Sequence, residues 1–403
     1  MLDLKSIKNA RDRLKGVAHR TPFSYAPSLS DISGYEVYLK KENLQLTGAF
    51  KLRGAFNKIA SLIEEDKIGG VVAASAGNHA QGVAFSAKYF NIQATIVMPD
   101  STPLTKVQGV KEFGADVILH GANYDEAYSY AIEYAKRYNR DFVHPFTDTS
   151  VMAGQGTIAL EMLEEHKNLD AIIVPVGGGG LISGIGVATK AINPNIKIIG
   201  VASLGATAMK DSFDTKEARS TKSVRTIADG IAVRDASPIT LQYILKYVDN
   251  LELVSEDEIA EAILFLLEKQ KLLVEGAGSV GVATLMQHRL NLPKGSKVGV
   301  VLSGGNIDVT MLSLIIEKGL VKSSRKMKLS VIMVDKPGSL MQFTKLLTQV
   351  NANIVQIGYD RTSIDLKFGD AVVSVDLETK GIEHQNEIRN ILSRNGFKFK
   401  ELR

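Results

Sequence analysis

Residues 171–189 read AIIVPVGGGGLISGIGVAT, a stretch without a single charged residue. A membrane-spanning helix would also be uncharged over this length. Four consecutive glycines and a proline argue against such a helix, because each glycine costs about 1 kcal/mol in a helix interior. We therefore interpret the stretch as a buried strand, a glycine loop and the start of a helix.

Around this stretch, from about residue 35 to residue 320, short β-branched runs alternate with segments of helical period. The alternation is typical of an α/β fold with βα units around mostly parallel sheets. Continuous apolar runs predict strands that are covered on both faces. These runs are VVAAS (71–75), ATIVMP (94–99), DVILH (116–120), AIIVPV (171–176), IKIIGVA (196–202) and KVGVVLS (297–303). Several end in Gly, Ser or Asn clusters, at the strand ends where open α/β sheets bind ligands.

The segment 318–328, KGLVKSSRKMK, breaks this rhythm with five basic residues and two serines. Its composition predicts a linker between domains. Residues 329–403 then alternate in the order βαββαβ, with the second helix expected at about residues 381–394. This order is the ferredoxin-like arrangement. The sequence therefore predicts one domain over residues 1–320 and a second over residues 329–403.

The composition excludes several classes of protein. The chain of 403 residues has 48 basic and 44 acidic ones, and its net charge of +4 is too small for a nucleic-acid-binding footprint. Its charged N-terminus, MLDLKSIKNARDRLKGV, lacks the apolar core of a signal peptide. It contains no cysteine, which rules out disulfides and thiolate chemistry. We therefore expect a cytoplasmic globular protein without nucleic-acid or membrane partners.

The glycine run from Gly177 to Gly180 follows an apolar strand and precedes a helical segment. Main-chain N–H groups in such a loop converge on a phosphate, aided by the positive end of the helix. A dinucleotide-binding loop has the same pattern but needs an acidic residue at the end of the next strand. Here that strand ends in Val201, Ala202 and Ser203. A phosphate site is therefore the preferred interpretation, and close helix–strand packing without a ligand stays open.

A second candidate site, SAGNHAQG at residues 75–82, also lies between a strand and a helix. The Ser75 hydroxyl, the Asn78 amide and adjacent main-chain N–H groups form an anion-binding turn suited to a carboxylate. An ordinary helix cap by a serine or asparagine side chain is the alternative.

Lys51 stands in the segment TGAFKLRGA, residues 47–55. With Thr47 as the expected N-cap, Lys51 lies in the first helical turn, where the helix dipole disfavours its ammonium form. A lowered pKa would free the Lys51 amine for Schiff-base chemistry. Most lysines in such a position are simply solvated, and this alternative stays open.

A fourth segment, SGGNID at residues 303–308, follows the strand KVGVVLS. It can place the Ser303 hydroxyl against a heterocycle nitrogen. A plain turn with a helix cap is the alternative.

Together and in this order, the four segments resemble the threonine and serine dehydratase branch of the fold-type II, or tryptophan-synthase-like, pyridoxal phosphate enzymes. The resemblance covers about residues 5–320. It implies two open α/β subdomains, the smaller one over about residues 46–150, and the cofactor pyridoxal 5'-phosphate. It also implies conversion of L-threonine to 2-oxobutanoate and ammonia, and of L-serine to pyruvate.

The same resemblance assigns roles to residues. Lys51 would carry the cofactor covalently and act in catalysis together with Ser75. The substrate carboxylate would bind in the turn formed by Ser75, Ala76, Gly77, Asn78 and His79. The cofactor-binding residues implied by the family motifs are Phe50 beside Lys51, Asn78 at the ring hydroxyl, Gly177, Gly178, Gly179 and Gly180 at the phosphate, Gly230 in an A-D-G turn, Glu275 in VEGAGS, and Ser303 with Gly304 at the pyridine nitrogen.

Two departures from the family's patterns bear on the reaction. Racemases of this family carry a second serine where this chain has Ala76, so racemisation is expected to be weak or absent. Many relatives bind a cation through acidic residues just after the strand IIGVA, where this chain offers Ala202 and Ala208. No divalent metal is therefore expected. Another β-elimination or β-replacement, or a racemase-like activity, is the alternative function.

Residues 329–403 resemble an ACT regulatory domain, with DKPGSL at residues 335–340 in the turn where such domains often bind amino acids. The resemblance implies an effector site at Pro337, Gly338, Ser339 and Leu340, and a homodimer or homotetramer. A helix start with proline near its first position and no ligand is the alternative. A non-enzymatic, amino-acid-binding regulator built on this domain is a third candidate function.

Overall fold

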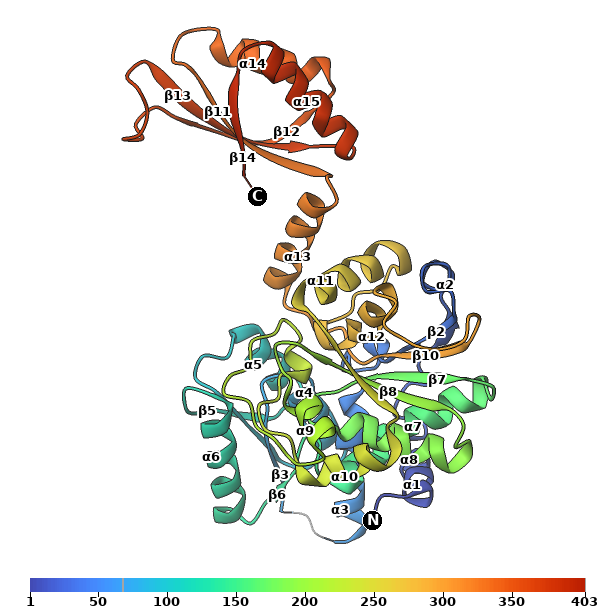
Figure 1. The fold of residues 1–403 in the computed structure, drawn as a ribbon. Coiled ribbons are helices and arrows are strands. Elements are labelled where there is room, and N and C mark those ends of the chain that lie inside the picture. Colours follow the sequence, from blue (N-terminus) through green and yellow to red (C-terminus); the bar gives the residue numbers. More distant parts are fainter. Residues whose placement is uncertain (67–68, 403) are drawn as a thin grey trace. The chain divides into compact units, whose positions relative to one another are not determined.

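Three sheets organise the described part of the chain, residues 1–66 and 69–402, in this computed structural model (Figure 1). Two of them lie in a first compact unit that ends at Asp308, and the third lies in a second unit that begins at Val309. The predicted α/β class and the predicted ferredoxin-like order of the C-terminal elements are confirmed.

The larger sheet of the first unit is mixed but mainly parallel. In sheet order its strands are β1 (Phe23–Tyr25), β2 (Glu36–Lys41), β10 (Lys297–Leu302), β7 (Ala171–Pro175), β8 (Lys197–Ser203) and β9 (Asn250–Val254). Strand β1 pairs antiparallel with β2, and the other neighbouring pairs are parallel. Every residue of β7 is buried, as expected for a central strand that is covered on both faces.

The smaller sheet of the first unit is entirely parallel. In sheet order its strands are β5 (Asp116–Leu119), β4 (Ala94–Met98), β3 (Val71–Ala74) and β6 (Asp141–Phe142). Strands β3 and β4 are fully buried, as predicted. For β5 the prediction of a strand covered on both faces is wrong, because β5 is an edge strand and both its end residues are exposed.

Helices connect most of these strands, as parallel pairing requires. In chain order they are α1 (Leu4–Leu14), α2 (Pro27–Ser33), the short turn η1 (Glu42–Leu44), α3 (Lys51–Glu64), α4 (Asn78–Tyr89), α5 (Leu104–Lys111), α6 (Tyr124–Arg137), α7 (Thr149–Glu165), α8 (Gly180–Ile192), α9 (Ala208–Thr215), η2 (Asp229–Ile231), α10 (Pro238–Tyr247), α11 (Glu256–Phe265), the π-helical η3 (Leu266–Gln270) and α12 (Gly276–Met286).

Residues 171–189, which decided the interpretation of the sequence, form β7, the glycine loop and most of α8. The strand, loop and helix start predicted there are confirmed. Among the described residues, no helix combines the length and the apolar character that crossing a bilayer would need.

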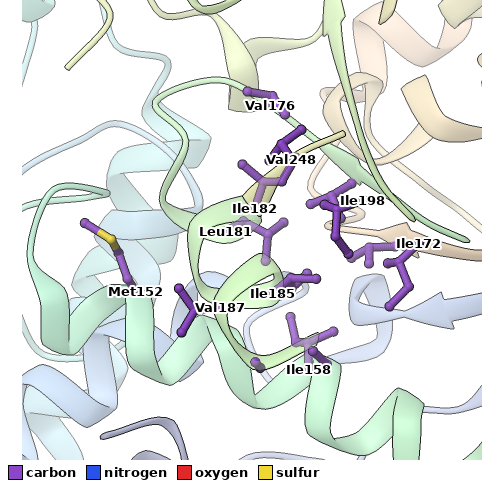
Figure 2. Packing of buried hydrophobic residues seen from close by; sticks show 14 of the residues in the cluster. Met152, Ile158, Ile172, Val176, Leu181, Ile182, Ile185, Val187, Ile198 and Val248 are labelled. Carbon is purple, nitrogen blue, oxygen red and sulfur yellow. The ribbon is translucent and has the colours of Figure 1, made fainter. Parts of the chain in front are cut away.

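Helices α7 and α8 pack closely in the main core of the first unit (Figure 2). Apolar side chains from the sheet and from both helices meet there, among them Ile158 of α7 and Ile185 of α8. A Cβ added at Gly156 would lie 2.8 Å from the carbonyl oxygen of Gly184, so the two helix backbones are nearly in contact. This packing fixes the glycine loop, because the loop ends at the first residue of α8.

A cluster of buried charges fixes the start of α3. Arg53 donates to both oxygens of Glu42, each at 2.8 Å, and to both oxygens of Glu161, at 2.6 and 3.0 Å. Lys40 of β2 forms an ion pair with Glu161 at 2.5 Å. Arg53, Glu42 and Lys40 are almost entirely buried. Because loss of any partner would leave an uncompensated buried charge, the helix that begins with Lys51 is held firmly between β2 and α7.

The second unit contains helix α13 and a ferredoxin-like βαββαβ fold. Its elements are α13 (Val309–Lys322), β11 (Lys326–Val334), α14 (Ser339–Gln349), β12 (Asn353–Asp360), β13 (Asp370–Glu378), α15 (Ile382–Arg394) and β14 (Lys398–Leu402). The antiparallel sheet has the order β12-β13-β11-β14. Helices α14 and α15 share a core with β11 and β13.

The segment predicted as a linker, residues 318–328, is regular over most of its length. It contains the end of α13, a short turn and the start of β11. Lys326 pairs with Glu317 at 2.6 Å and with Asp376 at 3.1 Å. Lys326 is therefore paired with acidic residues, although in the sequence it suggests a solvated linker. The boundary between the two units lies earlier, after Asp308.

Candidate active site

Lys51 is the first residue of α3, and Phe50 occupies the cap position without a side-chain cap. The prediction that Thr47 caps this helix is wrong. Its hydroxyl lies 3.5 Å from the Ala49 carbonyl oxygen and reaches no main-chain N–H of the helix. Residues before the helix are instead paired with another loop, which sets the direction in which the chain enters α3.

That other loop follows β10 and contains Ser303. The Phe50 N–H donates to the Ser303 carbonyl at 3.0 Å, and Ala49 forms a β-bridge with Gly304. Ser303 is only 2% exposed. The segment before Lys51 and the loop at Ser303, which are about 250 residues apart in the sequence, therefore lie side by side in the site.

The Lys51 amine lies at the end of the smaller sheet. Its Nζ donates to the Pro145 carbonyl, 2.9 Å away, in the loop that joins β6 to α7. Burial lowers the pKa of Lys51 from 10.5 to about 8, while the Glu275 carboxylate acts in the opposite direction. The solvated lysine considered as an alternative is therefore not what the fold contains, and about a tenth of this amine is neutral at pH 7, far more than for a lysine of ordinary pKa.

The side-chain amide of Asn78 forms hydrogen bonds to one carboxylate and to one other amide in the site. Its Nδ2 donates to Glu275 Oε1 at 2.8 Å and to Oε2 at 3.0 Å, and its Oδ1 accepts from Asn306 Nδ2 at 2.7 Å. Helix α4 begins at Asn78, and its cap residue Gly77 makes no side-chain cap. The ordinary helix cap considered for this turn is therefore wrong for Asn78, because its amide faces other loops and not its own helix.

Glu275 precedes α12 and is almost completely buried. Burial raises the pKa of its carboxyl, and the hydrogen bond from Asn78 lowers it. A Cβ added at Gly304 would lie 2.6 Å from Glu275 Oε1, and one added at Gly230 would lie 3.2 Å from the same atom. The fold thus brings Gly230, Glu275 and Gly304 together, and the carboxylate leaves less room for a side chain at Gly304 than at Gly230.

The turn after β3 supplies a polar but uncharged surface. The Ser75 hydroxyl accepts from the Gly77 N–H at 3.2 Å. His79 Nε2 lies 2.8 Å from the Val143 carbonyl and must carry the ring proton, because a carbonyl can only accept. Burial, together with the nearby Lys51 charge, lowers the pKa of His79 to about 3. His79 is therefore a neutral imidazole, and it offers no positive charge to a carboxylate.

The glycine loop forms a close-fitting cradle. Gly179 has a φ of 87°, which favours glycine, and α8 starts at the next residue. A Cβ added at Gly178 would lie 2.4 Å from the Phe146 ring, and one added at Gly177 would lie 2.7 Å from Ile231 Cα. The N–H groups of the first turn of α8 have no partner within the helix, so the loop fits the phosphate of pyridoxal phosphate. The neighbouring Lys51 amine fits its aldehyde.

Comparison with known proteins shows the family to which the chain belongs. The family described as pyridoxal-phosphate dependent enzyme matches residues 14–304. The L-threonine ammonia-lyase of Thermotoga maritima is 47% identical over 397 residues, which are 98% of this chain and 98% of that protein. This chain belongs to the threonine ammonia-lyase family of pyridoxal-phosphate dependent enzymes.

Two solved structures are similar in fold to this chain. The processed form of threonine deaminase isoform 2 from Solanum lycopersicum has a TM-score of 0.73 and 36% identity, and the match covers 78% of this chain and 86% of that one. Serine racemase from Dictyostelium discoideum has a TM-score of 0.72 and 37% identity, with 76% and 99% coverage. The predicted fold-type II architecture is thereby confirmed, and the choice of reaction rests on the site.

The end of β8, where a dinucleotide-binding protein would place an acidic residue, is used differently in this member of the threonine ammonia-lyase family. The Ser203 hydroxyl donates to Glu256 Oε1 at 2.6 Å, and Glu256 Oε2 accepts from Thr226 at 3.1 Å and from the Ile227 N–H at 2.6 Å. The carboxylate thus anchors the chain just before the turn at Gly230. Among the described residues, no group of three acidic or histidine side chains is placed to hold a metal ion.

Several residues of the site carry no role in the sequence interpretation. Asn306 lies in the SGGN segment, but only the fold shows that its amide reaches Asn78 and the Thr47 carbonyl. Pro145 and Phe146 belong to the loop after β6, which contacts both Lys51 and the glycine run. The dipeptide His144–Pro145, two residues after the apolar end of a short strand, is the signal that could have pointed to this loop.

Proposed function

We propose that this protein removes water and then ammonia from L-threonine to give 2-oxobutanoate, and that it converts L-serine to pyruvate in the same way. One observation carries the proposal. The Lys51 amine, with its pKa lowered to about 8, lies beside the Pro145 carbonyl in the loop after β6 of the smaller sheet, and its helix is joined to the Ser303 loop, which follows β10 of the larger sheet. A nucleophilic amine is thus placed at the strand ends of both sheets.

Lys51 is proposed to hold the cofactor covalently. When bound, pyridoxal phosphate supplies an electron sink that allows the Cα proton of an amino acid to leave. A free Lys51 Nζ would be the base that takes up this proton, because its lowered pKa leaves part of the amine unprotonated near neutral pH. The Pro145 carbonyl, 2.9 Å from Nζ, keeps the amine directed into the site.

The residues around Lys51 are proposed to position the rest of the cofactor. Gly177, Gly178, Gly179 and Gly180 would bind the phosphate, with Phe50 beside the ring and Asn78 at the ring hydroxyl. Ser303 would face the pyridine nitrogen as a neutral partner that does not force a full proton onto it. Gly304 and Gly230, which lie against the Glu275 carboxylate, would leave space for the ring. The close contacts at Gly178 and Gly304 support this arrangement.

The substrate carboxylate is proposed to bind the turn at Ser75, Ala76, Gly77, Asn78 and His79. The start of α4 provides main-chain N–H groups there, and its dipole favours an anion. Because His79 is neutral, attraction to the carboxylate comes from main-chain groups and from the hydroxyl and amide side chains of the turn. Ser75 is proposed to contact the reacting substrate directly.

A racemase is the alternative with a relative among solved structures, the Dictyostelium discoideum enzyme. Racemisation requires a group that returns a proton to the face of Cα opposite the one from which it left. Ala76 is part of the proposed substrate turn, and its methyl group cannot donate or accept a proton. We therefore favour elimination over racemisation, and over β-replacement, for this chain.

We further propose that the second unit is a regulatory domain of the ACT type, with an amino-acid effector at Pro337, Gly338, Ser339 and Leu340, in a cytoplasmic homodimer or homotetramer. Gly338, with a φ of 90°, caps α14, and Pro337 lies before this cap and not at the first helical position. The Asp335 carboxylate beside this turn accepts from the Tyr359 hydroxyl at 2.8 Å. These features support an effector site in this turn over the alternative of a plain helix start.

The first experiment combines a spectrum with an assay. The purified protein is expected to show the visible absorption band of lysine-bound pyridoxal phosphate, which changes on addition of L-threonine as 2-oxobutanoate forms. Lys51→Ala is expected to lose the band and at least about a thousandfold in kcat. The same variant should keep the far-UV circular dichroism of the wild type. A colourless protein that gains no band from added cofactor would contradict the proposal.

A further inference from the structure

Gln155 in α7 is completely buried, yet neither polar atom of its side-chain amide has a hydrogen-bond partner among the residues that the structure describes. Most buried polar groups in proteins are paired, so an unpaired amide requires an explanation. A leucine or methionine of similar volume would fill this space without the cost of two unpaired polar atoms. The amide is therefore expected to meet a partner that is not a residue of the chain.

The position of Gln155 indicates which partner this is. A Cβ added at Gly180, the first residue of α8, would lie 3.0 Å from Gln155 Oε1. A Cβ added at Gly54, one turn after Lys51 in α3, would lie 3.1 Å from Gln155 Nε2. The amide thus lies between the end of the glycine run and the helix that begins with the reactive lysine.

The backbone around Gln155 leaves its side chain little freedom to turn away. A Cβ at Gly154 would lie 2.2 Å from the Arg53 carbonyl, and one at Gly156 would lie 2.8 Å from the Gly184 carbonyl. Helix α7 is therefore pressed between α3 and α8 on both sides of Gln155. Rotation of the amide by 180° remains possible, and it exchanges nitrogen and oxygen without changing the occupied volume. Either atom can thus face the start of α8.

We propose that Gln155 is a binding residue for the phosphate of the cofactor, to which its amide N–H donates a hydrogen bond directly or through one buried water. This inference rests on the proposed function and adds a side chain to a site that otherwise consists of main-chain N–H groups. A neutral donor suits the position, because the phosphate carries the charge that the start of α8 attracts. A carboxylate there would oppose it.

The test compares ligands with and without the phosphate. Apoprotein is titrated with pyridoxal phosphate and with pyridoxal, and binding is followed by visible absorption and, for the phosphate, by phosphorus NMR. Gln155→Glu is expected to weaken pyridoxal phosphate binding by tenfold or more and to change pyridoxal binding by less than about twofold. Gln155→Met is expected to weaken pyridoxal phosphate binding by about tenfold while the apoprotein becomes no less stable.

Gln385 offers a matched control in the second unit, because it is also buried but its amide donates to the Lys326 carbonyl and to the Thr379 hydroxyl. Gln385→Met is expected to lower stability and leave pyridoxal phosphate affinity unchanged. Unchanged affinity in Gln155→Met, or an equal loss for pyridoxal and pyridoxal phosphate, would overturn the inference. If Gln155→Glu does not fold, the Gln155→Met titration decides alone. Failure of the wild type to bind the cofactor would instead contradict the proposed function.

Discussion

The side-chain amide of Asn78 donates to both carboxylate oxygens of Glu275, at 2.8 and 3.0 Å. Asn78 begins the helix after a strand of the smaller sheet, whereas Glu275 is the cap residue just before a helix that packs on the larger sheet. This pair therefore connects the two halves of the site. It also leaves the Glu275 charge close enough to the Lys51 amine to influence the pKa of that amine.

Replacement of Glu275 should change the pH dependence of cofactor attachment. The Glu275 charge raises the pKa of Lys51 against the stronger effect of burial. Glu275→Gln is therefore expected to lower this pKa below about 8, by on the order of one pH unit. The measurement is the rate of pyridoxal phosphate incorporation into apoprotein as a function of pH. Glu133→Gln, which removes an exposed charge, is the control, and an upward shift in Glu275→Gln would contradict the expectation.

Lys51 should destabilise the apoprotein in a pH-dependent way. Its folded-state pKa of about 8 lies below the ordinary value of 10.5, so between these values the unfolded chain binds more protons than the folded one. Wild-type stability should therefore rise with pH across this interval. Lys51→Met is expected to gain about 3 kcal/mol of unfolding free energy below pH 8, an advantage that shrinks toward pH 10.5. Urea unfolding of both apoproteins checks this, and a pH-independent difference would refute it.

Asn306 should act as a positioning residue. Its amide donates to the Thr47 carbonyl at 2.8 Å and to Asn78 Oδ1 at 2.7 Å, so it orients the amide that faces Glu275. Asn306→Ala is expected to lower kcat for L-threonine by about tenfold to a hundredfold, the effect of losing such a bond. Asn353→Ala, which removes an exposed amide paired with Glu378, is the control. Steady-state kinetics that match the wild type would remove Asn306 from this role.

Gly178 should tolerate a side chain only if the Phe146 ring is replaced by a smaller side chain. A Cβ at Gly178 would lie 2.4 Å from the Phe146 ring. Gly178→Ala is expected to weaken pyridoxal phosphate binding by tenfold or more, because either the ring or the loop must move. In a Phe146→Ala background the same substitution should cost much less, as a double-mutant cycle of cofactor affinities would show. Additive losses would mean that the ring contact is not what excludes a side chain.

Ala76 should limit the reaction to elimination. Ala76→Ser introduces a hydroxyl in the proposed substrate turn and is expected to produce measurable D-serine from L-serine, with 2-oxo acid formation retained. Chiral chromatography of the products detects this change, and Ala76→Val serves as a control that fills space without a proton donor. Formation of D-serine by the wild type at a rate similar to that of elimination would contradict our preference for a lyase.

The sequence by itself determined the chemistry and most of the secondary structure. Apolar runs located the strands, because burial on both faces demands continuous hydrophobicity. Glycine runs and polar turns located the loops, because only certain residues allow a backbone to approach a ligand. The segments around Lys51, Asn78, Gly178 and Ser303 resemble, in their order, the motifs of one enzyme family, and this resemblance grouped them into one site before any distance was known.

Tertiary structure alone decided the electrostatics and the supporting contacts. A sequence does not report burial. It therefore could not show that His79 is neutral, that the pKa of Lys51 is near 8, or that the buried Gln155 amide has no hydrogen-bond partner among the described residues. The failed prediction for Thr47 has the same origin, since pairing of Ala49 with Gly304 overrides local cap preference. Contacts between residues far apart in the chain set these properties, and local pattern does not encode them.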